Sequence, residues 1–214
     1  MSKSEMTAEK IVEIGSRLYK RGLIAGTDGN ISALIEPGQV MITPAGRSKD
    51  RLEPEEMIVI DDSGQKIAGK LRASSEMAMH LYLYSNRPDI FACVHAHPPF
   101  ATAFAAAGIS LNEKILPEII LSVGNIALTE YAPPGTPALP RSLDPFITDH
   151  NAFLLKNHGL VTIGSDLEEA YHRLETIEHF ARISYLAKRL GGADVLDTDE
   201  VLRLEAIRKS TIED

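Results

Sequence analysis

Residues 94–108 read VHAHPPFATAFAAAG, which joins an apolar run, two histidines and a stretch of small residues. The segment IFACVHAH, residues 90–97, predicts a buried strand, because it is a short and nearly continuous apolar run. Pro98 and Pro99 can open a helix, since proline fits the first helical turn, and Gly108 can close it. This strand followed by a helix indicates an α/β protein.

Further segments extend this pattern in both directions along the chain. Apolar residues at helical spacing predict helices over residues 7–21, 74–84 and 166–190, the second capped by Ser74 or Ser75. Short apolar runs predict strands at residues 31–36, 40–45, 57–61, 65–69, 125–132, 152–159 and 160–164. The tail from Asp194 is expected to be helical and to pack on a neighbouring subunit. We therefore expect one layered α/β domain over residues 1–214.

The composition disfavours several classes of function. The net charge of -8 is spread over interspersed charges of both signs, whereas nucleic acid binding needs a clustered basic surface. No apolar run approaches the roughly 20 residues that a membrane span needs. The first residues are polar, and the single cysteine, Cys93, fits a core side chain in its apolar run. We expect a cytoplasmic protein that binds neither nucleic acid nor membrane.

His95 and His97 are two residues apart on the predicted strand. Their side chains therefore point to one face, with Cα atoms about 6.6 Å apart. Two imidazoles at this spacing can converge on one metal ion, and a catalytic site needs about three protein ligands. His158 is the best candidate for the third, since it lies before Gly159 at a strand end, where ligands of α/β sheets tend to bind. Alone, an H-x-H pair is a weak signal.

The other four histidines have simpler interpretations. His172 and His179 share a face of the long predicted helix, and we interpret them as packing or interface residues. His150 lies in a predicted loop and is interpreted as solvated. His80 follows Glu76 by four residues on one helix, so it could support that carboxylate. A hydrogen-bonded core histidine is the commoner case.

The chain resembles the class II aldolase/adducin family, and the resemblance spans roughly residues 7–190. Each motif is short, but their joint order is specific. The matching segments are Gly26-Thr27-Asp28-Gly29-Asn30-Ile31-Ser32, Thr43-Pro44-Ala45-Gly46, Ser74-Ser75-Glu76, His95-Ala96-His97 and Asn157-His158-Gly159.

The resemblance implies a three-layer αβα sandwich around a central mixed, largely antiparallel β-sheet. It also implies a homotetramer with active sites at subunit interfaces. His95, His97 and His158 match the family's metal ligands, and Glu76 matches the catalytic carboxylate near the metal. The family's phosphate-binding positions correspond to Gly29, Asn30, Ala45, Gly46, Ser74 and Ser75.

The residue types at these positions also suit a phosphate. Glycines in the segment GTDGN, residues 26–30, let backbone N–H groups turn towards an anion, and Asn30 adds an amide donor. Ser74 and Ser75 offer hydroxyls at a helix N-terminus, where free N–H groups favour phosphate. An ordinary turn and a plain helix cap are the alternative interpretations.

Two cations follow the TPAG segment. Arg47 and Lys49 could help to steer anions towards such a site. The alternative is that they are simply solvated, as exposed cations usually are.

The resemblance implies a metal-dependent class II aldolase that reversibly cleaves a ketose 1-phosphate between C3 and C4. The products would be dihydroxyacetone phosphate and an aldehyde, and the ketose could be of the fuculose, deoxypentulose or methylthiopentulose type. A divalent ion would stabilise the enediolate charge as a Lewis acid, and Glu76 would transfer protons. Three imidazoles and a carboxylate suit Zn²⁺, and Mn²⁺, Co²⁺ or Fe²⁺ could occupy such a site.

Other functions on the same scaffold stay open. Pentulose-phosphate 4-epimerases of the family usually carry Asp at the position of Glu76 and read His-Thr-His instead of His-Ala-His, so this chain is more similar to the aldolases. Methylthioribulose-1-phosphate dehydratases and phospho-sugar-acid decarboxylases share the scaffold. A non-enzymatic, adducin-like scaffold is the alternative from a different class, but it has no physical reason to keep four converging ligands.

The chain also departs from fuculose-1-phosphate aldolase, which uses two tyrosines that have no counterpart here. Residues 116–123 read LPEIILSV, and the last tyrosine is Tyr185. The leaving-group acid and the aldehyde pocket are therefore not identified. Glu118 could line that pocket or be a partnered or exposed strand residue. Tyr131 with Gly135-Thr136 fits a further loop of the family.

Overall fold

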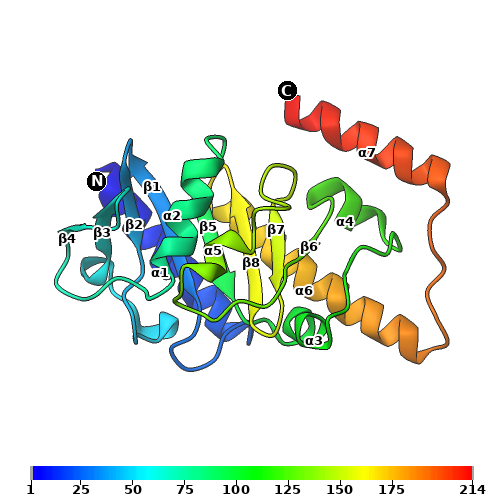
Figure 1. The fold of residues 1–214 in the computed structure, drawn as a ribbon, viewed down its shortest axis with the longest axis horizontal. Coiled ribbons are helices and arrows are strands. Elements are labelled where there is room, and N and C mark those ends of the chain that lie inside the picture. Colours follow the sequence, from blue (N-terminus) through cyan, green and yellow to red (C-terminus); the bar gives the residue numbers. More distant parts are fainter. Residues whose placement is uncertain (1, 214) are drawn as a thin grey trace.

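The computed structural model describes residues 2–213 and contains an eight-stranded sheet with helices on both faces (Figure 1). The strands are β1 (Asn30–Glu36), β2 (Gln39–Ile42), β3 (Ile58–Asp61), β4 (Lys66–Ala68), β5 (Ala92–Ala96), β6 (Ala127–Leu128), β7 (Ala152–Leu155) and β8 (Gly159–Gly164). Their order across the sheet is β4-β3-β2-β1-β5-β8-β7-β6. Only β6 and β7 pair in parallel, so the sheet is mixed and largely antiparallel, as expected.

Helices form a layer on each face of this sheet. One hydrophobic core lies between the sheet and α1 (Lys3–Lys20), α3 (Pro99–Ala107), α4 (Pro117–Ser122) and α6 (Leu167–Arg189). A second core lies under α2 (Met77–Asn86) and α5 (Ala138–Arg141) on the opposite face. Two short 3-10 helices, Lys49–Arg51 and Pro54–Glu56, connect β2 to β3. The predicted three-layer αβα sandwich is confirmed.

Side chains of β5 alternate between the two cores. Ala92, Val94 and Ala96 belong to the core with α1 and α6, whereas Cys93 packs into the core with α2. Because successive residues of a strand point to opposite faces, His95 shares the face of Cys93. The position of His95 in the strand therefore turns its ring towards the start of α2. Cys93 is fully buried, and the predicted core role of this cysteine is confirmed.

Both ends of the chain carry helices. The predicted helix over residues 7–21 begins four residues earlier, at Lys3, because Ser2 and Glu5 form a capping box ahead of the first apolar positions. The predicted helical tail is α7 (Thr198–Glu213), which packs against α4. Figure 1 shows α7 beyond the edge of the sheet. Packing of this tail on a neighbouring subunit stays a prediction.

The segment between α3 and β7 differs most from the sequence-based expectation. The predicted strand over residues 125–132 has only two paired residues, Ala127 and Leu128, since the chain then leaves the sheet towards the proline-rich loop. Residues 117–122 form helix α4, with Pro117 in its first turn, so the strand environment expected for Glu118 is wrong. Within residues 2–213, no helix is both long and apolar enough to cross a membrane.

Candidate metal centre and active site

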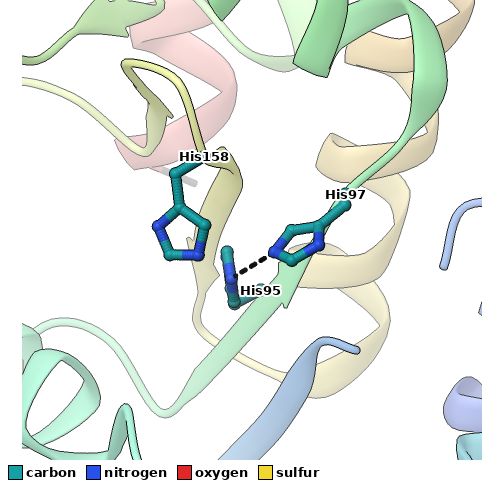
Figure 2. A group of neighbouring side chains, drawn as sticks. All are labelled: His95, His97 and His158. Carbon is teal, nitrogen blue, oxygen red and sulfur yellow. Dashed lines mark hydrogen bonds between the residues drawn. The ribbon is translucent and has the colours of Figure 1, made fainter. Parts of the chain in front are cut away.

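Three histidines from distant parts of the chain meet at one end of the central strands. His95 lies in β5, His97 follows this strand by one residue, and His158 lies in the turn between β7 and β8. Figure 2 shows the three rings gathered around a common space. One ligand atom from each lies within 4.8 Å of the others, and the two Nε2 atoms of His95 and His97 are 3.2 Å apart. The structure thus brings together the three histidines of the sequence analysis, whose role as ligands stays a prediction.

Backbone groups of the adjacent strand fix this cluster. Nδ1 of His95 donates to the carbonyl of Leu160 at 3.0 Å, which directs Nε2 towards the shared space. Gly159 lies directly behind the rings. A Cβ added to it would be 2.5 Å from Cδ2 of His97 and 2.7 Å from the carbonyl oxygen of Ala96. A larger residue at this position would displace the rings.

Glu76, the residue before α2, places its carboxylate against two of these rings. Its Oε2 lies 3.2 Å from Nε2 of His95, and its Oε1 lies 3.2 Å from Nε2 of His158. Burial alone would raise the pKa of Glu76. The charge of His95 and the contacts with His158, His95 and Asn30 outweigh burial and hold that pKa well below its usual range. The carboxylate is therefore ionised.

The donor atoms fit a divalent cation. Oε1 of Glu76 is buried and receives no hydrogen bond from any residue between 2 and 210, although it faces the imidazoles. Burial, together with the charges of His95 and His158, lowers the pKa of His97 to about 4, so its ring is neutral as a metal ligand must be. Three imidazole nitrogens beside a carboxylate oxygen form a set that Zn²⁺ and related ions prefer.

A buried chain of hydrogen bonds supports Glu76 from the opposite side. Nδ2 of Asn30 donates to Oε2 of Glu76 at 2.8 Å, and Oδ1 of Asn30 contacts Nε2 of His80. Nδ1 of His80 lies 2.6 Å from Oγ of Ser32, which is 2.8 Å from the hydroxyl of Tyr84. Burial, and then the charge of His95, lower the pKa of His80 to about 3. His80 is thus a satisfied core histidine that supports the carboxylate through Asn30.

A polar pocket of about 370 Å³ opens beside the carboxylate and the histidines. All six predicted phosphate-binding residues line it, namely Gly29, Asn30, Ala45, Gly46, Ser74 and Ser75. They come from the three separate segments GTDGN, TPAG and SSE. Gly29 has φ +73°, and a Cβ there would lie 2.8 Å from the carbonyl oxygen of His95, so the loop needs glycine to approach β5. Their contact with a phosphate stays a prediction.

The two serines do not cap α2, contrary to the sequence-based expectation. Helix α2 begins at Met77, and Glu76 occupies the cap position without a side-chain hydrogen bond to the helix. Oγ of Ser74 instead accepts from the backbone N–H of Glu76 at 3.3 Å, within a turn that precedes the helix. Ser75 is exposed at the pocket. The turn orients Glu76 and leaves both hydroxyls at the wall of the pocket.

Lys49 has a different environment from the one usual for lysine. It is only 2 % exposed and lines the pocket, so solvation is excluded for this residue. Arg47 is exposed, and its guanidinium pairs with Glu56 at 2.5 Å. Sequence patterning could not distinguish these two cations, because burial depends on the packing of α1 against the 3-10 helix.

The remaining candidates lie away from the cluster. His172 and His179 are exposed on α6, so packing within this chain is excluded and an interface role stays a prediction. His150 is half-buried against Phe146 instead of being fully solvated. Glu118 is exposed and lines a separate, mostly apolar hollow of about 270 Å³.

The proline-rich loop also reaches the candidate site. Pro134 lines the pocket, and the adjacent Gly135 faces the carbonyl oxygen of Ser75. Tyr131, in the same predicted family loop, is 56 % exposed. Sequence analysis placed this loop in the family pattern but did not assign Pro134 to the site.

Comparison with known proteins places this geometry in a family. The family described as "Class II Aldolase and Adducin N-terminal domain" matches residues 9–185. An L-fuculose phosphate aldolase of Methanococcus maripaludis is 35% identical over 186 residues, covering 87% of this chain and 99% of that protein. A 5-deoxy-D-ribulose 1-phosphate aldolase of Bacillus thuringiensis is 35% identical over 198 residues, covering 92% of each chain.

A relative with another activity is nearly as similar. A 3-oxo-tetronate 4-phosphate decarboxylase of Escherichia coli is 32% identical over 182 residues, covering 83% of this chain and 85% of that protein. Among solved structures, an L-fuculose 1-phosphate aldolase superposes with a TM-score of 0.88 at 30% identity, covering 95% of this chain and 96% of that one. The motifs, the sheet and these relatives agree, and the chain therefore belongs to the class II aldolase and adducin N-terminal domain family.

Proposed function

We propose that the protein is a metal-dependent aldehyde-lyase that reversibly cleaves a ketose 1-phosphate into dihydroxyacetone phosphate and an aldehyde. The observation that carries this proposal is the contact of the Glu76 carboxylate with His95 and His158 inside a pocket lined by the three candidate phosphate-binding segments. A candidate acid-base group, a candidate cation site and a candidate anion site thus adjoin one cavity. The relatives named as aldolases support the same reaction class.

Glu76 is the proton-transfer group of this proposal. Its carboxylate is ionised and fixed by Asn30, so it can accept a proton from substrate carbon in the direction of synthesis and return it during cleavage. His95, His97 and His158 would hold a divalent ion, which would supply Lewis-acid stabilisation of the negative charge that carbon–carbon cleavage leaves behind. Zn²⁺ is the proposed ion, since three imidazoles and one carboxylate match its preference.

The phosphate of the substrate is proposed to bind at the far side of the pocket. Gly29 and Gly46 both have positive φ, which turns backbone N–H groups in directions suited to an anion. Ser74 and Ser75 add hydroxyl donors. A homotetramer with active sites at subunit interfaces is part of the proposal, because the aldehyde end of this pocket has no identified acid from the chain itself.

Decarboxylation of a phosphorylated 3-oxo acid is a second candidate. One relative is named as such a decarboxylase, and decarboxylation also leaves an enolate, whose charge a divalent ion held by the three histidines would stabilise. Loss of carbon dioxide leaves an enolate whose carbon takes up one proton, but no hydroxyl of a departing aldehyde has to gain or lose a proton. This reaction therefore fits a chain that lacks both tyrosines expected of fuculose-1-phosphate aldolase.

The test is a substrate panel with zinc-loaded protein. Fuculose, rhamnulose, ribulose, 5-deoxyribulose and methylthioribulose 1-phosphates are assayed for dihydroxyacetone phosphate, and 3-oxo-tetronate 4-phosphate is assayed for carbon dioxide. Chelated protein and the variant Glu76→Gln are run in parallel, with zinc content measured for each. Triose phosphate release from a ketose 1-phosphate that needs both zinc and Glu76 supports the aldolase.

Other outcomes reject this assignment. Carbon dioxide release from 3-oxo-tetronate 4-phosphate, with no triose phosphate formed from any ketose 1-phosphate, selects the decarboxylase. Substrate consumption with neither product selects an epimerase or dehydratase. Full turnover by a zinc-loaded Glu76→Gln variant contradicts the proposed proton-transfer role. A protein that binds no metal and consumes no substrate is a scaffold.

A further inference from the structure

Lys49 is a fully buried cation that the proposed chemistry does not use. Its Nζ donates to the carbonyl oxygens of Thr27 and Arg47, each at 2.9 Å. Thr27 lies in the GTDGN segment and Arg47 follows the TPAG segment, so the ammonium links the two loops that line the candidate phosphate site. Gly15 of α1 allows this burial, because a Cβ there would be 3.1 Å from Cβ of Lys49.

The charge of Lys49 is not neutralised by a carboxylate. Both of its hydrogen-bond acceptors are neutral carbonyls, and no ion pair joins Lys49 to any carboxylate of residues 2–210. Asp28 is the acidic group that acts on it electrostatically, but its carboxylate is half exposed and lies 3.4 Å from Nδ1 of His97. Burial lowers the pKa of Lys49 to about 8, so it still carries its proton at neutral pH.

An unpaired cation in a buried position is unfavourable for the folded protein alone. Removing an ammonium group from water costs free energy that neutral acceptors recover only in part. A phosphate bound between the two loops would lie in the same pocket as Lys49 and provide the missing negative charge. Because Lys49 is buried, its attraction for the phosphate would be stronger than that of a lysine at the surface.

We propose that Lys49 supplies a fixed positive charge behind the GTDGN and TPAG loops and thereby determines the affinity of the pocket for a phosphate dianion. This inference rests on the phosphate subsite of the proposed function and adds a charge-bearing positioning residue to it. Lys49 orders the two loops through their carbonyl groups and acts on the phosphate through its charge. It takes no part in carbon–carbon cleavage.

The experiment measures binding of inorganic phosphate to zinc-loaded protein at pH 7 by calorimetry. Lys49→Met removes the charge and the donors, Lys49→Gln removes the charge but keeps an amide donor, and Lys49→Arg keeps both. Arg51→Met is the matched control, since Arg51 is an exposed cation on the same 3-10 helix. Melting temperature and zinc content are recorded for every variant without phosphate.

We expect phosphate affinity to fall 10- to 100-fold in Lys49→Met and Lys49→Gln, and less than threefold in Lys49→Arg and Arg51→Met. The melting temperature of Lys49→Met should change little, because the loss of a buried unpaired charge offsets the loss of its two hydrogen bonds to the loops. For the sugar phosphate that the panel identifies, KM should rise in Lys49→Met while kcat stays within threefold. This split between KM and kcat separates phosphate binding from cleavage.

Three results overturn the inference. Unchanged phosphate affinity in Lys49→Met would show that the charge of Lys49 does not contribute to phosphate binding. Wild-type phosphate affinity in Lys49→Gln would show that Lys49 only links the two loops and that its charge is not needed. This variant also provides the test if Lys49→Met does not fold. Absence of phosphate binding by the wild type would show that the pocket contains no phosphate subsite. If the protein binds phosphate in a Lys49-dependent way but has no lyase activity, this inference holds and the proposed reaction is rejected. Failure of the inference can therefore be told apart from failure of the proposed function.

Discussion

Asn30 donates its side-chain amide to Oε2 of Glu76 at 2.8 Å, while the carbonyl oxygen of the same amide contacts Nε2 of His80. One arrangement of protons satisfies every group. Tyr84 donates to Ser32, Ser32 donates to Nδ1 of a neutral His80, and Nε2 of His80 donates to Asn30. Assigned in this way, His80 prevents the amide from flipping, so Asn30 always presents a donor to Glu76.

The first prediction concerns this donor. Asn30→Leu keeps a side chain of similar size but removes the hydrogen bond to Glu76, and it leaves His80 without an acceptor. We expect zinc affinity or kcat to fall 10- to 100-fold, as is typical when a partner of a metal-site carboxylate is lost. Zinc titration and steady-state kinetics measure these two effects. Wild-type values for both would show that Asn30 does not orient Glu76.

The second prediction concerns metal removal. The Nε2 atoms of His95 and His97 lie 3.2 Å apart, and the carboxylate of Glu76 lies beside the cluster, so a bound cation should stabilise it. Chelation should abolish activity and lower the melting temperature, and added Zn²⁺ should restore both, since a ligand of the folded state stabilises it by mass action. His172→Asn, which changes an exposed histidine outside the cluster, should respond to chelation as the wild type does. A melting temperature that zinc does not raise would contradict a metal at this site.

Periodicity predicted the elements with strong local signals. Helix α6 follows its predicted range closely because Asp166 caps it and Leu190 ends it, both readable from the sequence. Helices α4 and α5 were missed because they are short, lie among prolines and depend on tertiary packing. The helix expected from Ser74 begins later, at Met77, because the hydroxyl of Ser74 accepts a hydrogen bond from the backbone N–H of Glu76 and stabilises a turn.

The candidate site was predictable where motifs carry it and unpredictable where packing decides. His95, His97, His158 and Glu76 lie in short motifs, and the structure brings them together. The burial of Lys49 has no sequence signal, because it requires α1 to pack closely against Lys49 at Gly15, a residue distant from Lys49 in the sequence.

The third prediction concerns Gly159. The φ of Gly159 is not positive, so an alanine there meets no backbone strain. The cost of the substitution comes instead from the added Cβ, which would lie 2.5 Å from Cδ2 of His97 and 2.7 Å from the carbonyl oxygen of Ala96. We expect Gly159→Ala to lower zinc affinity at least 10-fold and to destabilise the fold by about 1–3 kcal/mol, a usual cost of overpacking. Gly22→Ala is the control, because Gly22 has φ +68° and open space around it, so it should cost about 1–2 kcal/mol and leave zinc affinity unchanged. Equal zinc affinity in both variants would exclude a steric role for Gly159.

The fourth prediction concerns the pH dependence of stability through His80. Burial, and then the charge of His95, lower the pKa of His80 from about 6.5 to about 3 in the folded protein. Between these two values the unfolded chain binds a proton that the folded protein does not, so the free energy of unfolding falls as the pH is lowered through 6.5 towards 3. Between pH 7.5 and pH 5.0 this histidine alone should remove about 2 kcal/mol.

Urea unfolding of chelated protein at the two pH values measures this contribution. His80→Gln should be less stable than the wild type at pH 7.5 but should lose about 2 kcal/mol less on acidification, because glutamine does not titrate. Other titrating groups are common to both proteins and cancel in the difference. His172→Gln, which replaces an exposed histidine of α6, should keep the wild-type pH dependence. If His80→Gln lost as much stability on acidification as the wild type, His80 would have to be protonated in the folded protein, and the proton arrangement that orients Asn30 and Glu76 would be wrong.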